Sequence, residues 1–298
     1  MASSQPAVLR QPTVTFSPAA LESAKSGTDV RHNPEPDISP ASIAFNFLRY
    51  MHDSLRVSLG YIETLAKSLT FAHLPKLVQA FEGVALFVYL HSTQEEKALF
   101  PFINSRKDNF CSAFSSDHGK DLIQMAHIKQ LLVELIKDKF NETKGTRVQK
   151  ETLQWVHDHR CHLKLEEQYL KPILTGTTYS ENEEQDLVRK MINVDFLAWK
   201  TFQLCYCFER LTDKARVDYI TILQQCLPPA EYLQCREVLR PFFSEDVFDG
   251  FLEVDSESIN DEDEELSSPS RGSLLSTVVR FCSCSRAKPA ALAQTACS

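Results

Sequence analysis

Two segments of the chain share one pattern of residues that could bind a metal ion. The segment that starts at His91 reads HSTQEEKALFPFI, and the segment that starts at His162 reads HLKLEEQYLKPIL. Each has a histidine, a glutamate pair that begins four residues later, and a Leu-x-Pro ending. Imidazole nitrogens and carboxylate oxygens are common ligands of transition metals. The repeated pattern therefore indicates metal chemistry at two related places in the fold.

Helical geometry determines how these residues would act. Residues four apart lie on one face of a helix, about 6 Å apart along the axis, so His91 stands beside Glu95 and His162 beside Glu166. Two such pairs facing each other would supply two nitrogens and two bridging carboxylates, which suit a dinuclear site. A single His-x-x-x-Glu is more often a surface ion pair, but two copies with matching flanks favour the site.

Two further histidines complete the predicted ligand set. His52 and His127 lie in the other two long helical segments, and leucines follow each of them at helical spacing. The chain order becomes lone His, His-Glu, lone His, His-Glu, with one unit in each helix. The predicted metal ligands are His52, His91, Glu95, His127, His162 and Glu166.

The remaining histidines and glutamates near these motifs have other expected roles. Three histidines are interpreted as structural or exposed: His32, His73 and His118. His159 lies three residues before His162 and shares much of its face, so it is an alternative fifth histidine ligand; for His157 and His159 a solvated polar stripe or a supporting role is favoured. Glu96 and Glu167 lie about 100° round the helix from their neighbours and are expected to face solvent or to support a ligand.

Apolar spacing predicts the elements that must position these residues. Between the terminal segments glycine is scarce, and apolar residues recur at three- and four-residue steps, which is typical of amphipathic helices. Long helices are predicted at 40–69, 74–105, 117–141 and 147–174. Short connections between helices of similar length favour an up-and-down antiparallel four-helix bundle. The predicted fold class is therefore all-α, with a C-terminal helical extension.

Composition divides the chain into four predicted regions. Residues 1–38 are rich in Ser, Pro and Ala and are expected to be a disordered leader. Residues 39–178 form the predicted bundle, and residues 179–252 form the helical extension. Residues 253–298 begin with an acidic, serine-rich run and are expected to be a linker and disordered tail.

Charge and hydropathy exclude some classes of function. The formal net charge is −8, so no basic field attracts nucleic acid. No long apolar run or signal-peptide centre occurs, and the nine cysteines form no CxxC pair. We therefore expect an intracellular protein, cytoplasmic or nuclear, with reduced thiols. S-acylation of Cys282 and Cys284 would allow membrane attachment, but an unstructured terminus is favoured.

The ligand pattern resembles that of the hemerythrin-like family, whose HHE cation-binding helical bundles hold a non-haem di-iron centre. The resemblance covers residues 40–175 and rests on the six predicted ligands and the two Leu-x-Pro endings. It implies two iron ions with an oxo or hydroxo bridge, histidine ligands, and Glu95 and Glu166 as bridging carboxylates. Oxygen carriers of the family have a second histidine one turn after the third-helix ligand. That position is Leu131 here, which argues against reversible oxygen carriage.

The same family includes iron-responsive proteins attached to ubiquitin-ligase machinery. The predicted extension resembles the helical segment that follows the bundle in plant hemerythrin-type iron-sensing ligases, although no RING, CHY-type zinc or F-box pattern is visible in this chain. The resemblance implies iron or oxygen sensing, or iron homeostasis, with iron and dioxygen as ligands and a protein partner at residues 179–252. An oxygen- or peroxide-reactive di-iron enzyme and a metal-free helical adaptor remain alternatives; enzymatic activity is not favoured, because no substrate-binding loop is recognisable.

Overall fold

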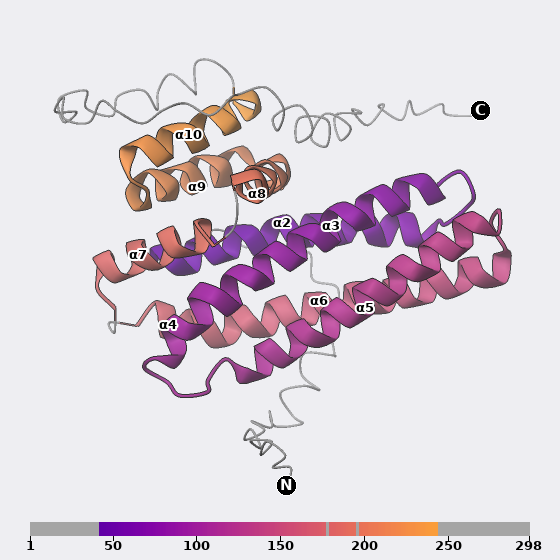
Figure 1. Cartoon of the computed structure of the whole chain (residues 1–298), viewed down its shortest axis with the longest axis horizontal. Helices are drawn as coiled ribbons and strands as arrows, with labels where there is room; N and C mark the ends of the chain where they lie inside the picture. Colours follow the sequence, from indigo (N-terminus) through magenta and orange to yellow (C-terminus); the bar gives the residue numbers. More distant parts are fainter. Residues whose placement is uncertain (1–41, 177–178, 195–196, 244–298) are drawn as a thin grey trace, which may run out of the picture. The chain divides into compact units, whose positions relative to one another are not determined.

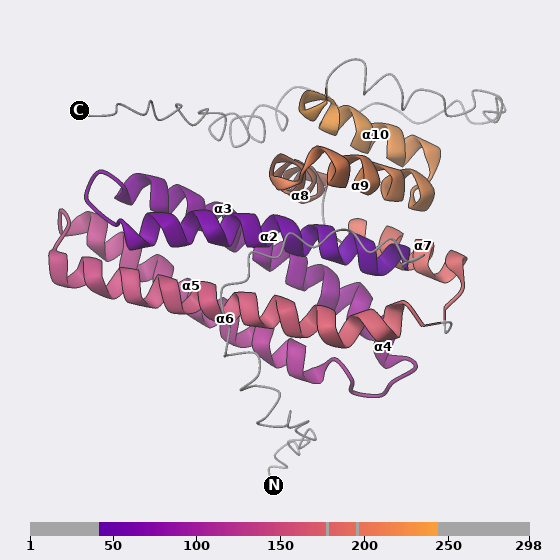
Figure 2. The ribbon, with the colours of Figure 1, turned by 180° about the vertical axis from the view of Figure 1, so that it is seen from behind.

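The computed structural model describes residues 42–176, 179–194 and 197–243. These residues form helices joined by short connections and contain no strand (Figures 1 and 2), which confirms the predicted all-α class. The chain divides between Met191 and Ile192 into two compact units. None of the described helices is both long and apolar enough to cross a membrane. The predicted leader, the acidic linker and the tail with Cys282 and Cys284 lie outside the described residues.

Long helices that lie side by side make up most of the first unit (Figure 1). They are α2 (Ile43–Lys67), α3 (Leu74–Gln94), α5 (Ser112–Lys137) and α6 (Glu142–Leu174). A π-helical segment, η1 (Glu95–Leu99), and a short helix, α4 (Phe100–Asn104), continue the path of α3. Helix α2 packs against α3 and α6, and α5 packs against the same two helices. The apolar faces of all the long helices therefore enclose one core.

Local chemistry fixes the ends of these helices. Ser42 and Asn141 cap α2 and α6, because each side-chain oxygen accepts a backbone N–H from three residues later. Lys139 and Phe140 have positive φ angles of 52° and 65° and turn the chain after α5. The Phe140 ring packs against Gly145, where an added Cβ would lie 3.3 Å from the ring. Helices α5 and α6 are thus joined by a tight turn.

Aromatic side chains fill the core of the first unit. Phe47, Phe81, Phe87 and Trp155 are buried, with at most 1% of each side chain exposed. Phe81 meets Trp155 edge to face, with ring centroids 5.3 Å apart. Such a pair adds about 0.5–1.5 kcal/mol beyond area burial. Closely packed aromatic rings therefore lie in the same core as the buried polar groups.

Helix α7 (Glu181–Ile192) also packs on the first unit. The Glu184 carboxylate accepts the backbone N–H of Ala44 at 3.3 Å, at the start of α2. Glu183 pairs with Arg106, whose guanidinium lies over the Tyr179 ring at 4.3 Å. The predicted extension begins at 179 and includes α7; these two contacts join α7 to Ala44 and Arg106.

The second unit consists of shorter helices. They are α8 (Leu197–Arg210), α9 (Asp213–Cys226) and α10 (Pro229–Leu239), followed by one 3₁₀ turn, η2 (Arg240–Phe242). Helix α10 contacts both α8 and α9. Thr212 caps α9 through its side-chain oxygen, and Pro228 stands between α9 and α10. Phe208 and Tyr219 meet edge to face at 5.4 Å inside this unit.

Candidate metal centre

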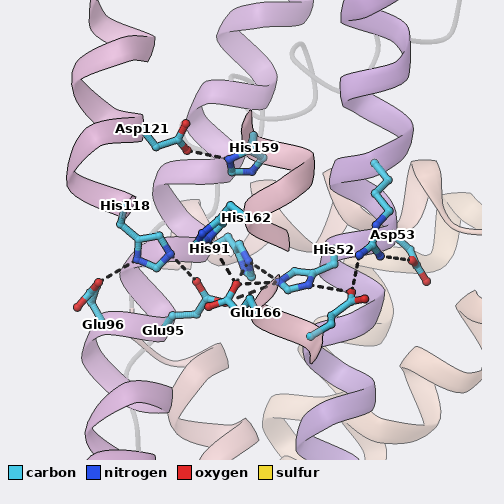
Figure 3. Close-up of polar contacts among 12 residues, drawn as sticks. His52, Asp53, His91, Glu95, Glu96, His118, Asp121, His159, His162 and Glu166 are labelled. Carbon is cyan, nitrogen blue, oxygen red and sulfur yellow. Dashed lines mark hydrogen bonds and ion pairs between the residues drawn. The ribbon is translucent and has the colours of Figure 1, made fainter. Parts of the chain in front are cut away.

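Buried histidines and glutamates meet in the core of the first unit (Figure 3). They form two donor groups, and within each group the candidate ligand atoms all lie within 4.8 Å of one another. The first donor group is His52, His91, Glu95 and Glu166; the second donor group is His118, His162 and Glu166. Glu166 belongs to both groups, so two cations held there would share its carboxylate.

Glu95 also lies between the two groups. Its Oε1 is 3.2 Å from Nε2 of His91, and its Oε2 is 3.2 Å from Nε2 of His118. The Glu95 side chain is fully buried. The two oxygens of this carboxylate therefore face histidines of different groups: Oε1 faces His91 and Oε2 faces His118. This is the orientation of a bridging ligand.

The contacts of Glu166 are similar but longer. Its Oε2 lies 3.5 Å from Nε2 of His52 and 3.5 Å from Nε2 of His162. Glu166 is fully buried, and the His162 side chain is 11% exposed. The two carboxylates thus contact histidines from α2, α3, α5 and α6.

A close approach of two imidazole nitrogens is informative about the first donor group. Nε2 of His52 lies 3.0 Å from Nε2 of His91, and the two rings are perpendicular. Two neutral rings that both present a lone pair at this distance would repel each other, so either a proton on one ring, which makes a hydrogen bond, or a shared cation must lie between the nitrogens. Around one ion with bonds of about 2.1 Å, ligand atoms at right angles lie about 3.0 Å apart. The nitrogen pair therefore has the spacing of adjacent ligands on one ion.

The buried polar atoms of this cluster provide a test of whether a metal fits. Both carboxylate oxygens of Glu95 and of Glu166, and Nε2 of His118, are buried and have no hydrogen-bond partner among the described residues. A buried polar group without a partner is rare and costs free energy. Cations between the two carboxylates would satisfy these atoms together. The residues present therefore fit a metal centre.

Two further carboxylates hold His52 and His118 in place. Nδ1 of His52 donates to Glu167 Oε1 at 2.9 Å, and Nδ1 of His118 donates to Glu96 Oε1 at 2.8 Å. Glu167 also pairs with Arg56 at 2.8 Å. A carboxylate at one ring nitrogen fixes the orientation and tautomer of a metal-binding histidine. The second glutamate of each motif thus supports the lone histidine of another helix.

The backbone of the first motif differs from that of the second. Glu95 begins the π-helical segment η1, and the backbone N–H of Phe100 bonds to the Glu95 carbonyl oxygen. The second motif remains α-helical through Glu166 and up to Leu174. Single π turns inside α-helices occur frequently at functional sites. The two motifs reach similar donor positions through different helical turns.

The structure brings together five of the six predicted ligands. His52, His91, Glu95, His162 and Glu166 all belong to the donor groups. His127 belongs to neither group and is partly exposed on α5. His118, which the sequence analysis interpreted as structural or exposed, is only 6% exposed and occupies the α5 position in the cluster.

Helical rotation explains the difference between His118 and His127. They are nine residues apart, so about 900° of rotation puts them on opposite faces of α5. A signal for the inward face was present in the sequence. Leu135, Leu132, Ile128 and Met125 are buried and lie three or four residues apart, so they share one face of α5. His118 lies seven residues, or about two turns, before Met125 and therefore shares that face. The same spacing misses His127.

Protons partly replace a cation in the metal-free centre. Burial alone lowers the pKa of His52, but its hydrogen bond to Glu167 and the nearby carboxylate of Glu95 outweigh burial and raise this pKa to about 9. Burial also lowers the pKa of His118, but the nearby carboxylate of Glu95 and the hydrogen bond to Glu96 raise it to about 10. Burial lowers the pKa of His91 to about 3. The metal-free centre at pH 7 therefore holds His52 and His118 as cations and His91 as a neutral ring.

We expect metal binding at pH 7 to release about two protons, because His52 and His118 must lose theirs before their ring nitrogens can bind a metal. Burial and the negative charge of Glu95 also raise the pKa of Glu166, which adds to the release. Affinity should rise by up to about 100-fold per pH unit below pH 9. Titration calorimetry in buffers of different ionisation enthalpy measures the proton count; a count of zero would contradict these charge assignments.

Comparison of the chain with family models, curated proteins and solved structures gave no match. The inference of metal binding therefore depends on the donor groups themselves. In its described residues the chain is all-helical and contains two buried His/Glu groups that could hold metal ions.

Proposed function

We propose that the chain is a hemerythrin-like protein whose four-helix bundle holds two non-haem iron ions, and that it senses iron or oxygen or takes part in iron homeostasis. The observation that carries this proposal is the sharing of buried Glu166 between two donor groups. The proposed ligands are His52, His91, Glu95, His118, His162 and Glu166, with His118 in the place first predicted for His127. The order lone His, His-Glu, lone His, His-Glu is thereby kept.

The chemistry of the donors supports iron. Imidazole and carboxylate ligands suit iron, and they also bind manganese and zinc. Bound iron would supply redox chemistry and an affinity for dioxygen. The protein supplies orientation and a dry setting: Phe100 stacks on the His118 ring with centroids 5.5 Å apart, and Phe114 lies 6.2 Å from His162. These rings would limit the access of water to the second donor group.

The origin of the donors supports a sensing role. They come from α2, the α3–η1 run, α5 and α6, so one pair of ions would hold all the long helices together. Binding free energy at such a site becomes folding free energy. Iron occupancy would then change the stability of the first unit. In this proposal the extension over residues 179–252 presents that state to a protein partner.

Metal analysis of protein purified without chelators tests the proposal. We expect two irons per chain and charge-transfer absorption in air that the His91→Ala variant loses. Two zinc or two manganese ions per chain would support the dinuclear site but contradict iron as its metal. Metal-free protein that does not take up added Fe²⁺ would favour the adaptor alternative and overturn the proposal.

A measurement of hydrogen peroxide consumption separates the sensor from an enzyme. We expect the iron-loaded protein to consume peroxide no faster than the His91→Ala variant. Rapid turnover that depends on His91 would replace the sensing role with a peroxide-reactive enzyme.

A further inference from the structure

A seventh polar side chain, His159, lies beside the second donor group on α6 (Figure 3). It is 4% exposed. Its Nδ1 lies 2.9 Å from Asp121 Oδ2 on α5, and the other oxygen of Asp121 accepts the indole N–H of Trp155. Nε2 of His159 is buried and has no hydrogen-bond partner among the described residues.

The setting of His159 matches that of two proposed ligands. His52 and His118 each have a carboxylate at Nδ1 and direct Nε2 toward the cluster. Nδ1 of His159 faces Asp121, so Nε2 is the ring nitrogen that remains for a metal ion. A buried ring nitrogen without a hydrogen-bond partner costs free energy, and binding to a cation would satisfy it. The carboxylate at Nδ1 is the usual support for a metal-binding histidine.

The position of His159 assigns it to the second donor group. Its ring centroid lies 5.7 Å from that of His162, and the His162 ring lies 5.0 Å from that of His118. The second donor group otherwise offers two imidazoles, as the first does. His159 Nε2 is not within 4.8 Å of every donor in the second group. Binding of His159 to an ion in this group therefore requires the ring to lie closer to the group than it does in this structure.

We propose that His159 supplies a third histidine nitrogen to the ion in the second donor group, and that Asp121 and Trp155 are positioning residues for it. This proposal rests on the proposed metal-binding function. It makes the centre asymmetric, with two imidazoles on one ion and three on the other. Loss of His159 should then lower the affinity for one ion and leave the affinity for the other unchanged.

Anaerobic Fe²⁺ titration against a competing chelator tests this asymmetry. For the wild-type chain we expect two ions. For His159→Gln, which can keep a hydrogen bond to Asp121, we expect one ion unchanged and the other bound about 10- to 100-fold more weakly. Asp121→Asn should lower the affinity for the same ion by up to about 10-fold. His157→Gln is the matched control, because His157 is exposed on the same helix, and it should bind both ions normally.

A spectroscopic readout separates ligation from a packing role. Mössbauer spectra of the ⁵⁷Fe-loaded wild-type chain should show two inequivalent iron sites, and the His159→Gln chain should lose one of them at limiting iron. Unchanged affinity and unchanged spectra in His159→Gln would overturn the role of His159 while leaving the metal centre intact. A wild-type chain that binds no Fe²⁺ would instead overturn the proposed function. Circular dichroism of the metal-free variants checks that each is folded, and Asp121→Asn provides a second variant if His159→Gln is not.

Discussion

Replacement of Glu166 by leucine is expected to remove both metal ions, whereas replacement of a single histidine should chiefly affect one. Glu166 is the residue common to the two donor groups, so its loss takes a carboxylate from each ion. We expect each affinity to fall by about 100-fold or more, above the effect of removing a supporting residue. Metal content by mass spectrometry after equilibration with Fe²⁺ measures the loss.

The same variant should be stable without metal. The buried Glu166 oxygens have no hydrogen-bond partner among the described residues, and such a group costs about 1–3 kcal/mol. Leucine has a similar volume and no polar atom, so the metal-free Glu166→Leu chain should melt at least as high as the metal-free parent. His127→Leu is the control, because His127 lies outside both groups. A Glu166→Leu chain with two tightly bound irons would contradict the shared-carboxylate geometry.

The parts of the centre that follow from local geometry could be predicted from the sequence. The pairs His91 with Glu95 and His162 with Glu166 require only that each segment be helical, since residues four apart always share a face. The match between the two motifs then indicated a shared site. His52 was selected by its place in the repeated order, and it also lies in the first donor group.

The α5 ligand was missed, although apolar residues at helical spacing lead to it, because its helix was predicted to start too late. The polar residues before position 117 were interpreted as a connection, which left His118 at a helix end. In the structure α5 begins at Ser112, and Phe114 is buried in its first turn. An apolar residue in that turn extends the inward stripe to His118. The correct start of α5 would have distinguished the inward face from the face of His127.

The features that could not be predicted from the sequence depend on contacts between distant segments. The pairing of Asp121 with His159 joins α5 to α6, and the bond from Ala44 to Glu184 joins the start of α2 to α7. No periodicity within one segment encodes either contact. The π turn at Glu95 is similar, since the second motif has almost the same pattern and remains α-helical. Such features depend on tertiary packing, which overrides local preference.

Removal of bound metal is expected to lower the melting temperature of the first unit by about 8–16 °C. A ligand at 1,000 times its Kd stabilises the folded state by about 4 kcal/mol, and about 1 kcal/mol shifts the melting temperature by about 2–4 °C for 150–250 residues. Differential scanning calorimetry of iron-loaded and chelator-treated protein measures the shift. Within its described residues the second unit contains no donor group, so a transition from that unit should not move. An unchanged first transition would contradict metal-coupled stability.

The size of this shift should depend on pH, because protons stabilise the metal-free centre. The pKa values of His52 and His118 are raised to about 9 and about 10 in the folded protein. Their stabilising effect is complete below the ordinary value of about 6.5 and is lost as the pH rises through 9 to 10. The metal-bound rings carry no proton, so metal-bound protein does not lose this contribution. The difference in melting temperature between the two forms should therefore widen from pH 7 to pH 9, and a difference that narrows over this range would show that protons do not occupy these two histidines.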